Sequence, residues 1–170
     1  MTQTLTEPLG VFQKVFDGEL ITGDHPAYDS VRALWNTEID RHPTVIARCT
    51  KPTDVASAVT FGREQGLEIA VRCGSHNAAG TASCDGGLMI DLSLMRSVSV
   101  DPRSRRVRVA GGALLGDMDA ATQAHGLATT AGTVSPHRRR RAHPRRRIRL
   151  AGPPARAGGR QPALRRGGHG

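Results

Sequence analysis

Hydrophobic and polar residues alternate along residues 1–135 with the two periods that distinguish helices from strands. Apolar side chains spaced three or four apart predict helices over 8–17, 26–36, 52–66 and 113–126. In the second of these, Val31, Leu34 and Trp35 share one face. Short apolar or alternating runs predict strands over 44–49, 68–73, 87–93, 97–101 and 105–112. The last two strands are spaced as a hairpin, and residues 127–135 are expected to be extended and then loop. From residue 44 the predicted order is β-α-β-loop-β-β-β-α, which indicates an α+β or α/β layered unit.

Charge divides the chain into two unlike segments. Residues 1–135 contain all 15 acidic residues, half of the 24 basic residues and every aromatic residue. Residues 136–170 contain twelve arginines, no acidic residue and only three large aliphatic side chains: Ile148, Leu150 and Leu164. So few apolar side chains cannot offset the entropy of ordering the segment. We therefore expect 136–170 to be a disordered basic tail.

Several classes of protein are disfavoured by the sequence. No apolar run approaches the roughly 20 residues of a membrane span, and MTQTLTEPLG does not resemble a secretory signal. Cys49, Cys73 and Cys84 are odd in number and lack the C-x-x-C spacing of a disulfide framework or zinc site. We expect reduced thiols, a cytoplasmic protein and no metal site.

The most informative stretch is VRCGSHNAAG, residues 71–80, where a predicted strand enters a loop of small residues. Glycine and small side chains let backbone N–H groups approach an anion such as a phosphate. From spacing alone, an ordinary turn is the simpler interpretation. The segment around Gly111 and Gly112 has neither the G-x-G-x-x-G order of a dinucleotide-binding fold nor the lysine of a P-loop. From spacing alone, we interpret these two glycines as a strand-to-helix turn.

Two longer runs carry a resemblance to a known family. They are RHPTVIARCTKPTDVASAVTFGREQGLEIAVRCGSHNAAG and DGGLMIDLSLMRSVSVDPRSRRVRVAGGALLGDMDAATQAHGLATTAGTVS. Together they resemble the FAD-binding domain of the vanillyl-alcohol-oxidase and p-cresol-methylhydroxylase (PCMH) superfamily, in its berberine-bridge-enzyme-like branch. The resemblance implies an N-terminal helical segment over 1–40 and an incomplete PCMH-type domain over 41–135.

The resemblance also implies site residues. The family motif, roughly R-G/S-G-G-H, is occupied here by Arg72, Cys73, Gly74, Ser75 and His76. This loop, with Asn77, is expected to bind FAD, its backbone amides wrapping the pyrophosphate. His76 is expected to be the covalent attachment point for the flavin 8α carbon. Cys73 and Ser75 depart from the family pattern, and glycine at position 75 would allow a φ that serine disfavours.

Further flavin neighbours implied by the resemblance are Gly111, Gly112, Gly132 and Thr133. Some family members form a second flavin link through a cysteine, but Val134 occupies the matching position, so we expect only one link. The implied function is hydride abstraction from a small organic substrate by an FAD-linked oxidoreductase. The family's catalytic base and substrate pocket lie in a later domain, so no catalytic residue is assigned and this chain is expected to be truncated and inactive.

Two explanations remain for residues 136–170. In the family, the stretch after Ser135 is glycine-rich, and a one-base frameshift in a GC-rich gene would replace it with arginine codons. The alternative is a protein that binds nucleic acid non-specifically through the unopposed arginines. The tail lacks the aromatic residues that stack on bases.

Overall fold

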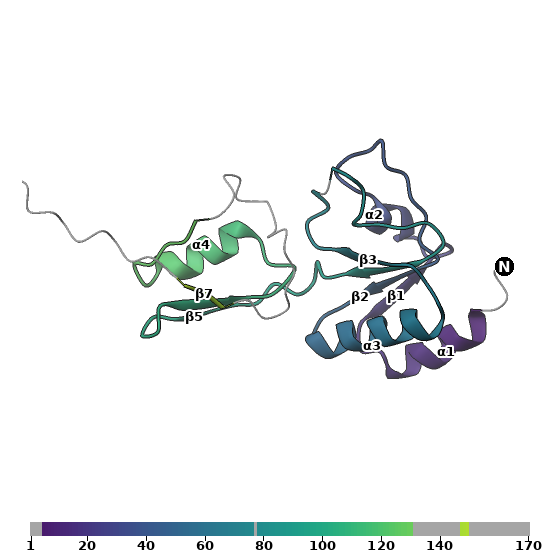
Figure 1. Ribbon diagram of the computed structural model, residues 1–170, viewed down its shortest axis with the longest axis horizontal. Helices are drawn as coiled ribbons and strands as arrows, with labels where there is room; N and C mark the ends of the chain where they lie inside the picture. The colour runs from purple at the N-terminus through teal and green to yellow at the C-terminus, as the bar shows by residue number, and fades with distance from the viewer. Residues whose placement is uncertain (1–4, 77, 131–146, 150–170) are drawn as a thin grey trace, which may run out of the picture.

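The computed structural model of the protein describes residues 5–76, 78–130 and 147–149 (Figure 1). The helices are α1 (Thr6–Val15), α2 (Tyr28–Arg32), α3 (Pro52–Glu64) and α4 (Leu115–Gln123). The strands are β1 (Glu19–Thr22), β2 (Val45–Arg48), β3 (Ile69–Arg72), β4 (Leu88–Asp91), β5 (Val98–Asp101), β6 (Arg106–Val109) and β7 (Arg147–Arg149). From β2 to α4 the order is the one that the hydrophobic pattern predicts.

A four-stranded sheet forms the first part of the molecule, in the order β1-β2-β4-β3. Strands β2, β4 and β3 are parallel, and β1 is antiparallel to β2. The β2-α3-β3 unit leaves room for one strand between β2 and β3. After the 73–87 loop the chain enters this position as β4. The central strands are buried on both faces, which explains why they read as continuous apolar runs.

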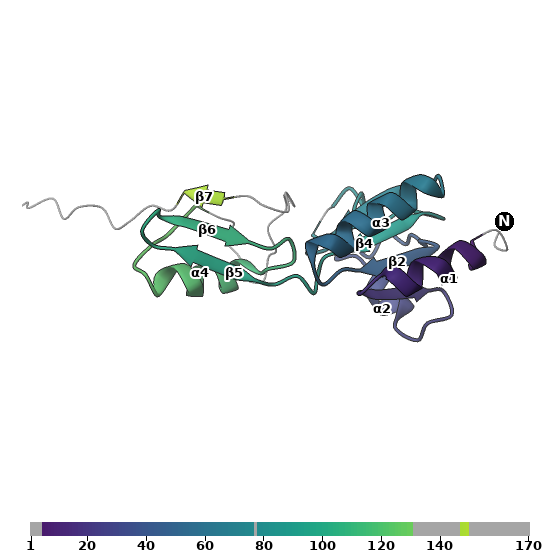
Figure 2. The same ribbon diagram turned by 90° about the horizontal axis from the view of Figure 1, so that it is seen from below.

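Helices cover both faces of this sheet (Figures 1 and 2). On one face α1 and α3 pack through Phe12 and Phe61, together with Phe16 just after α1, onto alternate residues of β2 and β4. On the other face Tyr28 of α2 packs against Ile21, Ile46 and Met89. The helix expected over 26–36 ends at Arg32, so Trp35 lies beyond α2 and is 73% exposed rather than packed beside Val31.

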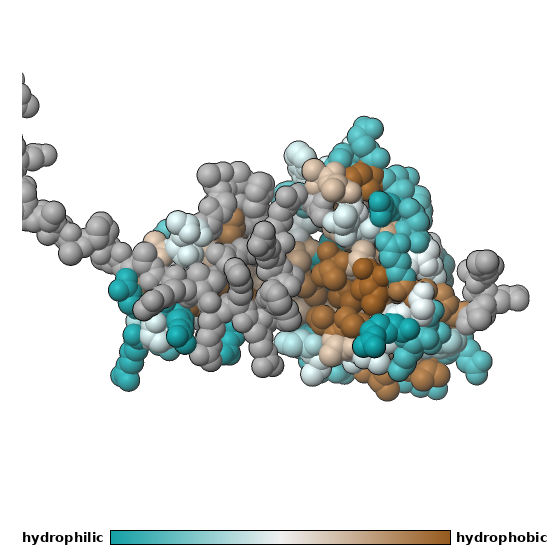
Figure 3. Space-filling model, viewed as in Figure 1, coloured by the Kyte–Doolittle hydropathy of each residue, from teal (hydrophilic) through white to brown (hydrophobic). Residues whose placement is uncertain are grey.

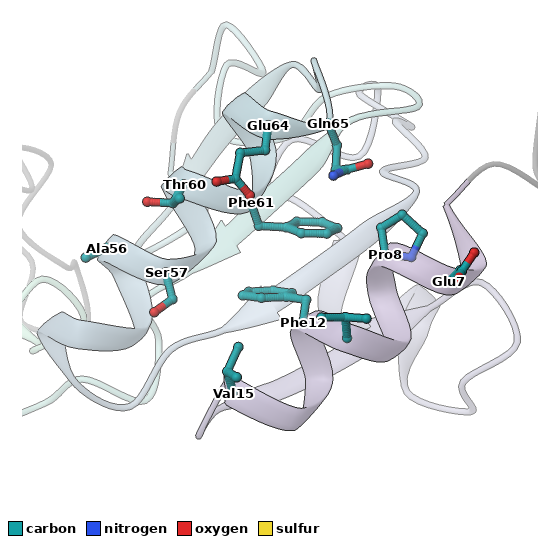
Figure 4. A pocket seen from close by; sticks show the side chains of 11 residues that line it. Glu7, Pro8, Phe12, Val15, Ala56, Ser57, Thr60, Phe61, Glu64 and Gln65 are labelled. Carbon is teal, nitrogen blue, oxygen red and sulfur yellow. The ribbon is translucent and has the colours of Figure 1, made fainter.

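The contact between α1 and α3 is only partly closed. The rings of Phe12 and Phe61 stack with centroids 4.4 Å apart and planes 7° from parallel. Beside them lies an open apolar groove of about 630 Å³ in which Val11 and Val15 remain exposed (Figure 4). Figure 3, a space-filling view in the orientation of Figure 1, shows apolar surface over β3. Val71 of this edge strand is 43% exposed.

A second sheet, β5-β6-β7, lies beside the first with α4 on one face (Figure 2). The predicted hairpin is confirmed: β5 and β6 pair antiparallel, with Val98 opposite Val109 and Asp101 opposite Arg106. Their apolar residues, including Val107, pack on Met118 of α4.

Two short strands were not predicted from the sequence. Strand β1 lies within the segment 1–40 that we expected to be helical, and β7 lies within the tail expected to be disordered. Both form through pairing with a neighbour, β2 and β6 respectively, and backbone pairing leaves little pattern in three or four residues. The rest of 136–170, and the disorder expected for it, lie outside the described residues.

The two sheets are joined where the chain leaves β4. Gly112 donates its N–H to the Met95 carbonyl at 2.9 Å. A Cβ at Gly112 would lie 1.8 Å from the Leu92 carbonyl oxygen, so only glycine fits here without a backbone shift. Across the described ranges, no helix is long and apolar enough to cross a membrane.

Candidate functional site

Three charged residues lie together at the carboxyl edge of the first sheet. Arg48, Arg72 and Asp91 are the last residues of β2, β3 and β4, and the register places both arginines opposite Asp91. Their side chains therefore share one face of the sheet, the face covered by α2. In parallel sheets the carboxyl ends of the strands form the usual ligand-binding edge.

Asp91 is the centre of this charged cluster. It is fully buried and accepts hydrogen bonds from the Ser93 N–H at 2.9 Å and the Ser93 hydroxyl at 2.8 Å. Its Oδ2 lies 3.5 Å from Nε of Arg48 and 3.5 Å from Nη1 of Arg72. Arg48 also pairs with Glu19 at 2.7 Å, whereas its Nε is buried without a hydrogen-bond partner in the structure.

Arg72 connects the sheet to the loop that follows β3. Its Nε donates to the Ser75 hydroxyl at 2.6 Å, and its Nη2 donates to the Ala33 carbonyl at 3.4 Å. Burial lowers the pKa of Arg72 below its ordinary value; the charge of Asp91 raises it, and that of Arg48 lowers it. The guanidinium is thus engaged on three sides by protein groups, which suits it to hold the loop in place.

Ser75 adopts the left-handed conformation that the family comparison associates with glycine, with φ at +59°. For a residue with a Cβ this conformation costs roughly 1–2 kcal/mol. The Ser75 hydroxyl accepts the Arg72 hydrogen bond, and its carbonyl accepts the N–H of Trp35 at 3.2 Å. A hydrogen bond to a charged group contributes about 1.5–3 kcal/mol, enough to offset the strain.

His76 follows directly and is half-buried. Its imidazole lies beside the Trp35 indole, with ring centroids 6.2 Å apart and planes at 51°. Cys73 is half-buried and packs against the core of the first sheet. Farther along the loop, Gly80 has a φ of +75° and lies against Ile39, where a Cβ would come within 2.8 Å.

The Leu92 peptide brings the two glycine-bearing segments of the sequence together. Its N–H donates to the Arg72 carbonyl at 2.9 Å, and its carbonyl lies against Gly112. Gly111 therefore also lies close to the carboxyl edge. Of the remaining expected site residues, Asn77, Gly132 and Thr133 lie outside the described residues.

The sequence analysis missed both Arg48 and Asp91 as members of the site. Asp91 also caps the turn after β4, where it accepts two hydrogen bonds from Ser93. The sequence did contain a signal for this cluster, since a charged residue lies at the end of each of three apolar runs. Only the register of the strands shows that these three residues lie side by side.

The residues at this edge fit a dinucleotide with a diphosphate. The loop is rich in small residues and has left-handed turns at Ser75 and Gly80, features that leave its backbone accessible to an anion. Arg48 and Arg72 lie at this edge beside the buried Asp91, and Arg48 is also paired with Glu19. His76 places an imidazole ring in this loop, beside Trp35. The described part of the chain contains no group of three or more side chains placed to hold a metal ion.

Comparison with known proteins agrees with this geometry. A family described as FAD binding domain matches residues 43–137. The chain is 37% identical over 132 residues to (R)-6-hydroxynicotine oxidase of Paenarthrobacter nicotinovorans, covering 78% of this chain and 28% of that protein. The chain thus spans little more than a quarter of that relative's length.

Solved structures give the same match. The crystal structure of 6-hydroxy-D-nicotine oxidase from Arthrobacter nicotinovorans superposes with a TM-score of 0.69 at 36% identity, covering 72% of this chain and 27% of that one. Glucooligosaccharide oxidase from Acremonium strictum, studied for its 6-S-cysteinyl, 8α-N1-histidyl FAD, superposes with a TM-score of 0.69 at 27% identity. This superposition covers 76% of this chain and 28% of the glucooligosaccharide oxidase chain.

Proposed function

This chain belongs to the FAD-binding domain family of PCMH-type and berberine-bridge-enzyme-like oxidoreductases, and on that premise we propose that its 72–76 loop is a flavin attachment site. His76 would carry FAD through a bond to the flavin 8α carbon. The observation that supports this most directly is the left-handed Ser75, held by Arg72, which presents His76 at the carboxyl edge of the parallel strands.

Each site residue has a distinct task in this proposal. The amides of the 73–77 loop would face the pyrophosphate, and Gly111, Gly112, Gly132 and Thr133 would border the flavin. Arg72 would act by holding the loop, because its guanidinium nitrogens contact Ser75, Asp91 and Ala33. Bound FAD supplies the redox chemistry, the acceptance of a hydride.

The substrate class follows from the relatives. Proteins similar to this chain are named as oxidases of 6-hydroxynicotine and of glucooligosaccharides. For the complete family architecture we propose oxidation of a small organic substrate by hydride abstraction. This chain spans about 28% of the length of the 6-hydroxynicotine oxidase, so the oxidation is proposed for the complete family architecture.

Two further expectations concern the setting of the protein. We propose a reducing compartment such as the cytoplasm, in which Cys49, Cys73 and Cys84 remain outside disulfide bonds. Binding of nucleic acid through 136–170 rests on charge alone. No feature of the described residues favours it, and it is not proposed as a function.

The attachment site is tested by incubating the purified chain with excess FAD, denaturing it in acid and scanning for protein-bound flavin absorbance. We expect a small acid-stable flavin fraction, lost in His76→Ala and retained in the matched variant His125→Ala, which changes an exposed histidine beyond α4. An acid-stable adduct that persists in His76→Ala would contradict the proposed attachment.

A further inference from the structure

A segment outside the matched family region runs alongside the proposed flavin loop. Residues 33–39 precede the matched residues 43–137 in the sequence. In the structure they run beside the loop 72–80 and contact it at four successive positions. The pairs in contact are Ala33 with Arg72, Trp35 with Ser75, Asn36 with Ala78, and Ile39 with Gly80. The segment thus forms a second wall beside the loop, in register with it.

Trp35 is the aromatic residue of this wall. Its backbone is fixed by the 3.2 Å hydrogen bond to the Ser75 carbonyl, and the neighbouring Leu34 is buried with 6% exposure. Its indole nevertheless remains 73% exposed, more than any other large hydrophobic side chain in the described part of the chain. Trp35 is therefore anchored through its backbone, and its ring has exposed surface that a planar ligand can contact.

The position of that face identifies the ligand. The indole centroid lies 6.2 Å from the imidazole centroid of His76, within the range of direct aromatic packing. A flavin held by His76 through its 8α carbon necessarily has its dimethylbenzene edge next to this imidazole. A planar, apolar ring edge is the kind of surface on which an indole packs.

We propose that Trp35 is a flavin-contacting residue, whose indole packs against the dimethylbenzene end of the isoalloxazine. This inference rests on the proposed function, since it takes His76 as the attachment point. It assigns a binding role to a residue outside the matched domain and implies that Trp35 recognises the flavin half of FAD and not its adenine half.

Saturation-transfer NMR with FAD tests this inference, because it detects weak binding and distinguishes flavin from adenine protons. Every chain in the comparison carries His76→Ala, which excludes covalent attachment. In this background the chain with Trp35 unchanged is compared with Trp35→Ala and Trp35→Phe, and Val15→Ala is the matched control. Val15 is 69% exposed but lies on α1, on the opposite face of the sheet from α2. Circular dichroism and the Tm confirm that each variant folds.

We expect Trp35→Ala to reduce transfer to the isoalloxazine methyl protons several-fold, on the order of the affinity carried by one aromatic contact. Transfer to the adenine protons should stay unchanged, while Trp35→Phe and Val15→Ala should resemble the Trp35 chain. Equal methyl transfer in Trp35→Ala and the Trp35 chain would overturn the role of Trp35 alone. Absence of transfer to any FAD proton in the Trp35 chain would overturn the proposed function, and the inference with it.

Discussion

Cys49 lies just beyond β2, fully buried and close to two carboxylates. Burial raises the pKa of its thiol to about 12, and the charges of Asp54 and Asp91 act in the same direction. Burial also raises the pKa of Cys84 above its ordinary value. Since the thiolate is the reactive form, neither thiol should react in the folded chain. Cys73 is half-buried in the site loop and remains the accessible thiol.

Labelling with a disulfide reagent at a pH of about 8 checks this prediction. We expect one fast-reacting thiol in the folded chain, absent in Cys73→Ser, and reaction of all three cysteines after unfolding. Fast reaction of two thiols in the folded chain would show that Cys49 or Cys84 is less protected than its burial indicates.

Individual residues also show what could be inferred without coordinates. The glycine-like backbone of Ser75 was predictable, because the family motif has glycine there and the φ is +59°. The link between Arg48 and Asp91 was not, since 43 positions of sequence separate them and only strand register places them opposite each other. The helix expected over 26–36 was wrong beyond Arg32, so Trp35 does not share a helical face with Val31.

At the scale of an element, Asp54 is the group that fixes the start of α3. Its carboxylate accepts hydrogen bonds from the Thr50 N–H and hydroxyl, both at 2.8 Å, and from the Lys51 N–H at 3.1 Å. Burial raises the pKa of Asp54, but these bonds and the Lys51 charge outweigh it, so the pKa lies below its ordinary value of 3.8. The ionised form therefore stabilises the folded chain.

Replacing this cap should give a pH-dependent loss of stability. The pKa of Asp54 is lower in the folded state than in the unfolded chain. The stability that its ionised carboxylate contributes is therefore complete above pH 3.8, and it disappears as the pH falls through the lower pKa of the folded state. We expect Asp54→Ala to lower the free energy of unfolding by about 1–2 kcal/mol near neutral pH. Urea unfolding over a pH series should show this difference shrinking in acid.

Glu64→Ala, at the exposed end of the same helix, provides the control and should change stability little. A deficit in Asp54→Ala that stays constant down to strongly acidic pH would mean that packing of the side chain, and not its charge, stabilises α3.

The elements that could be predicted have strong internal patterns. Helix α3 begins at a proline and is followed by Gly66 with a φ of +64°, as its sequence signals indicate. Strands β1 and β7 have four and three residues and arise through pairing with β2 and β6. A strand whose existence depends on its neighbour leaves no local periodicity to detect.

For the whole molecule, the two sheets meet at the segment after β4, and the proposed flavin loop and Gly112 lie on either side of Leu92. The proposed site therefore lies at one edge of the first sheet, formed by the ends of its parallel strands. Strand β3 forms an outer edge of that sheet with Val71 exposed, a place where further chain or another molecule could pair.

The abrupt change of composition after Ser135 leads to a prediction about the gene. By resemblance, the family continues there with a glycine-rich stretch, whereas this chain reads PHRRRRAHPRRRIRL. An arginine codon CGG followed by C contains GGC, a glycine codon, one base later. A permitted set of codons for residues 136–152, read without its first base, encodes RTGVGGLTLGGGFGWLA.

We therefore expect the DNA across codons 130–140 to contain one extra base relative to the frame that continues the domain. Sequencing that region of the gene and of its transcript checks this directly. The shifted frame should encode a glycine-rich run, and a chain expressed in that frame should retain more FAD than this one, because that frame restores the stretch with which the family is expected to continue. Codons whose shifted reading yields stops or no glycine run would show that the arginine segment is the gene's own, and that the loss of the family pattern at Ser135 has another origin.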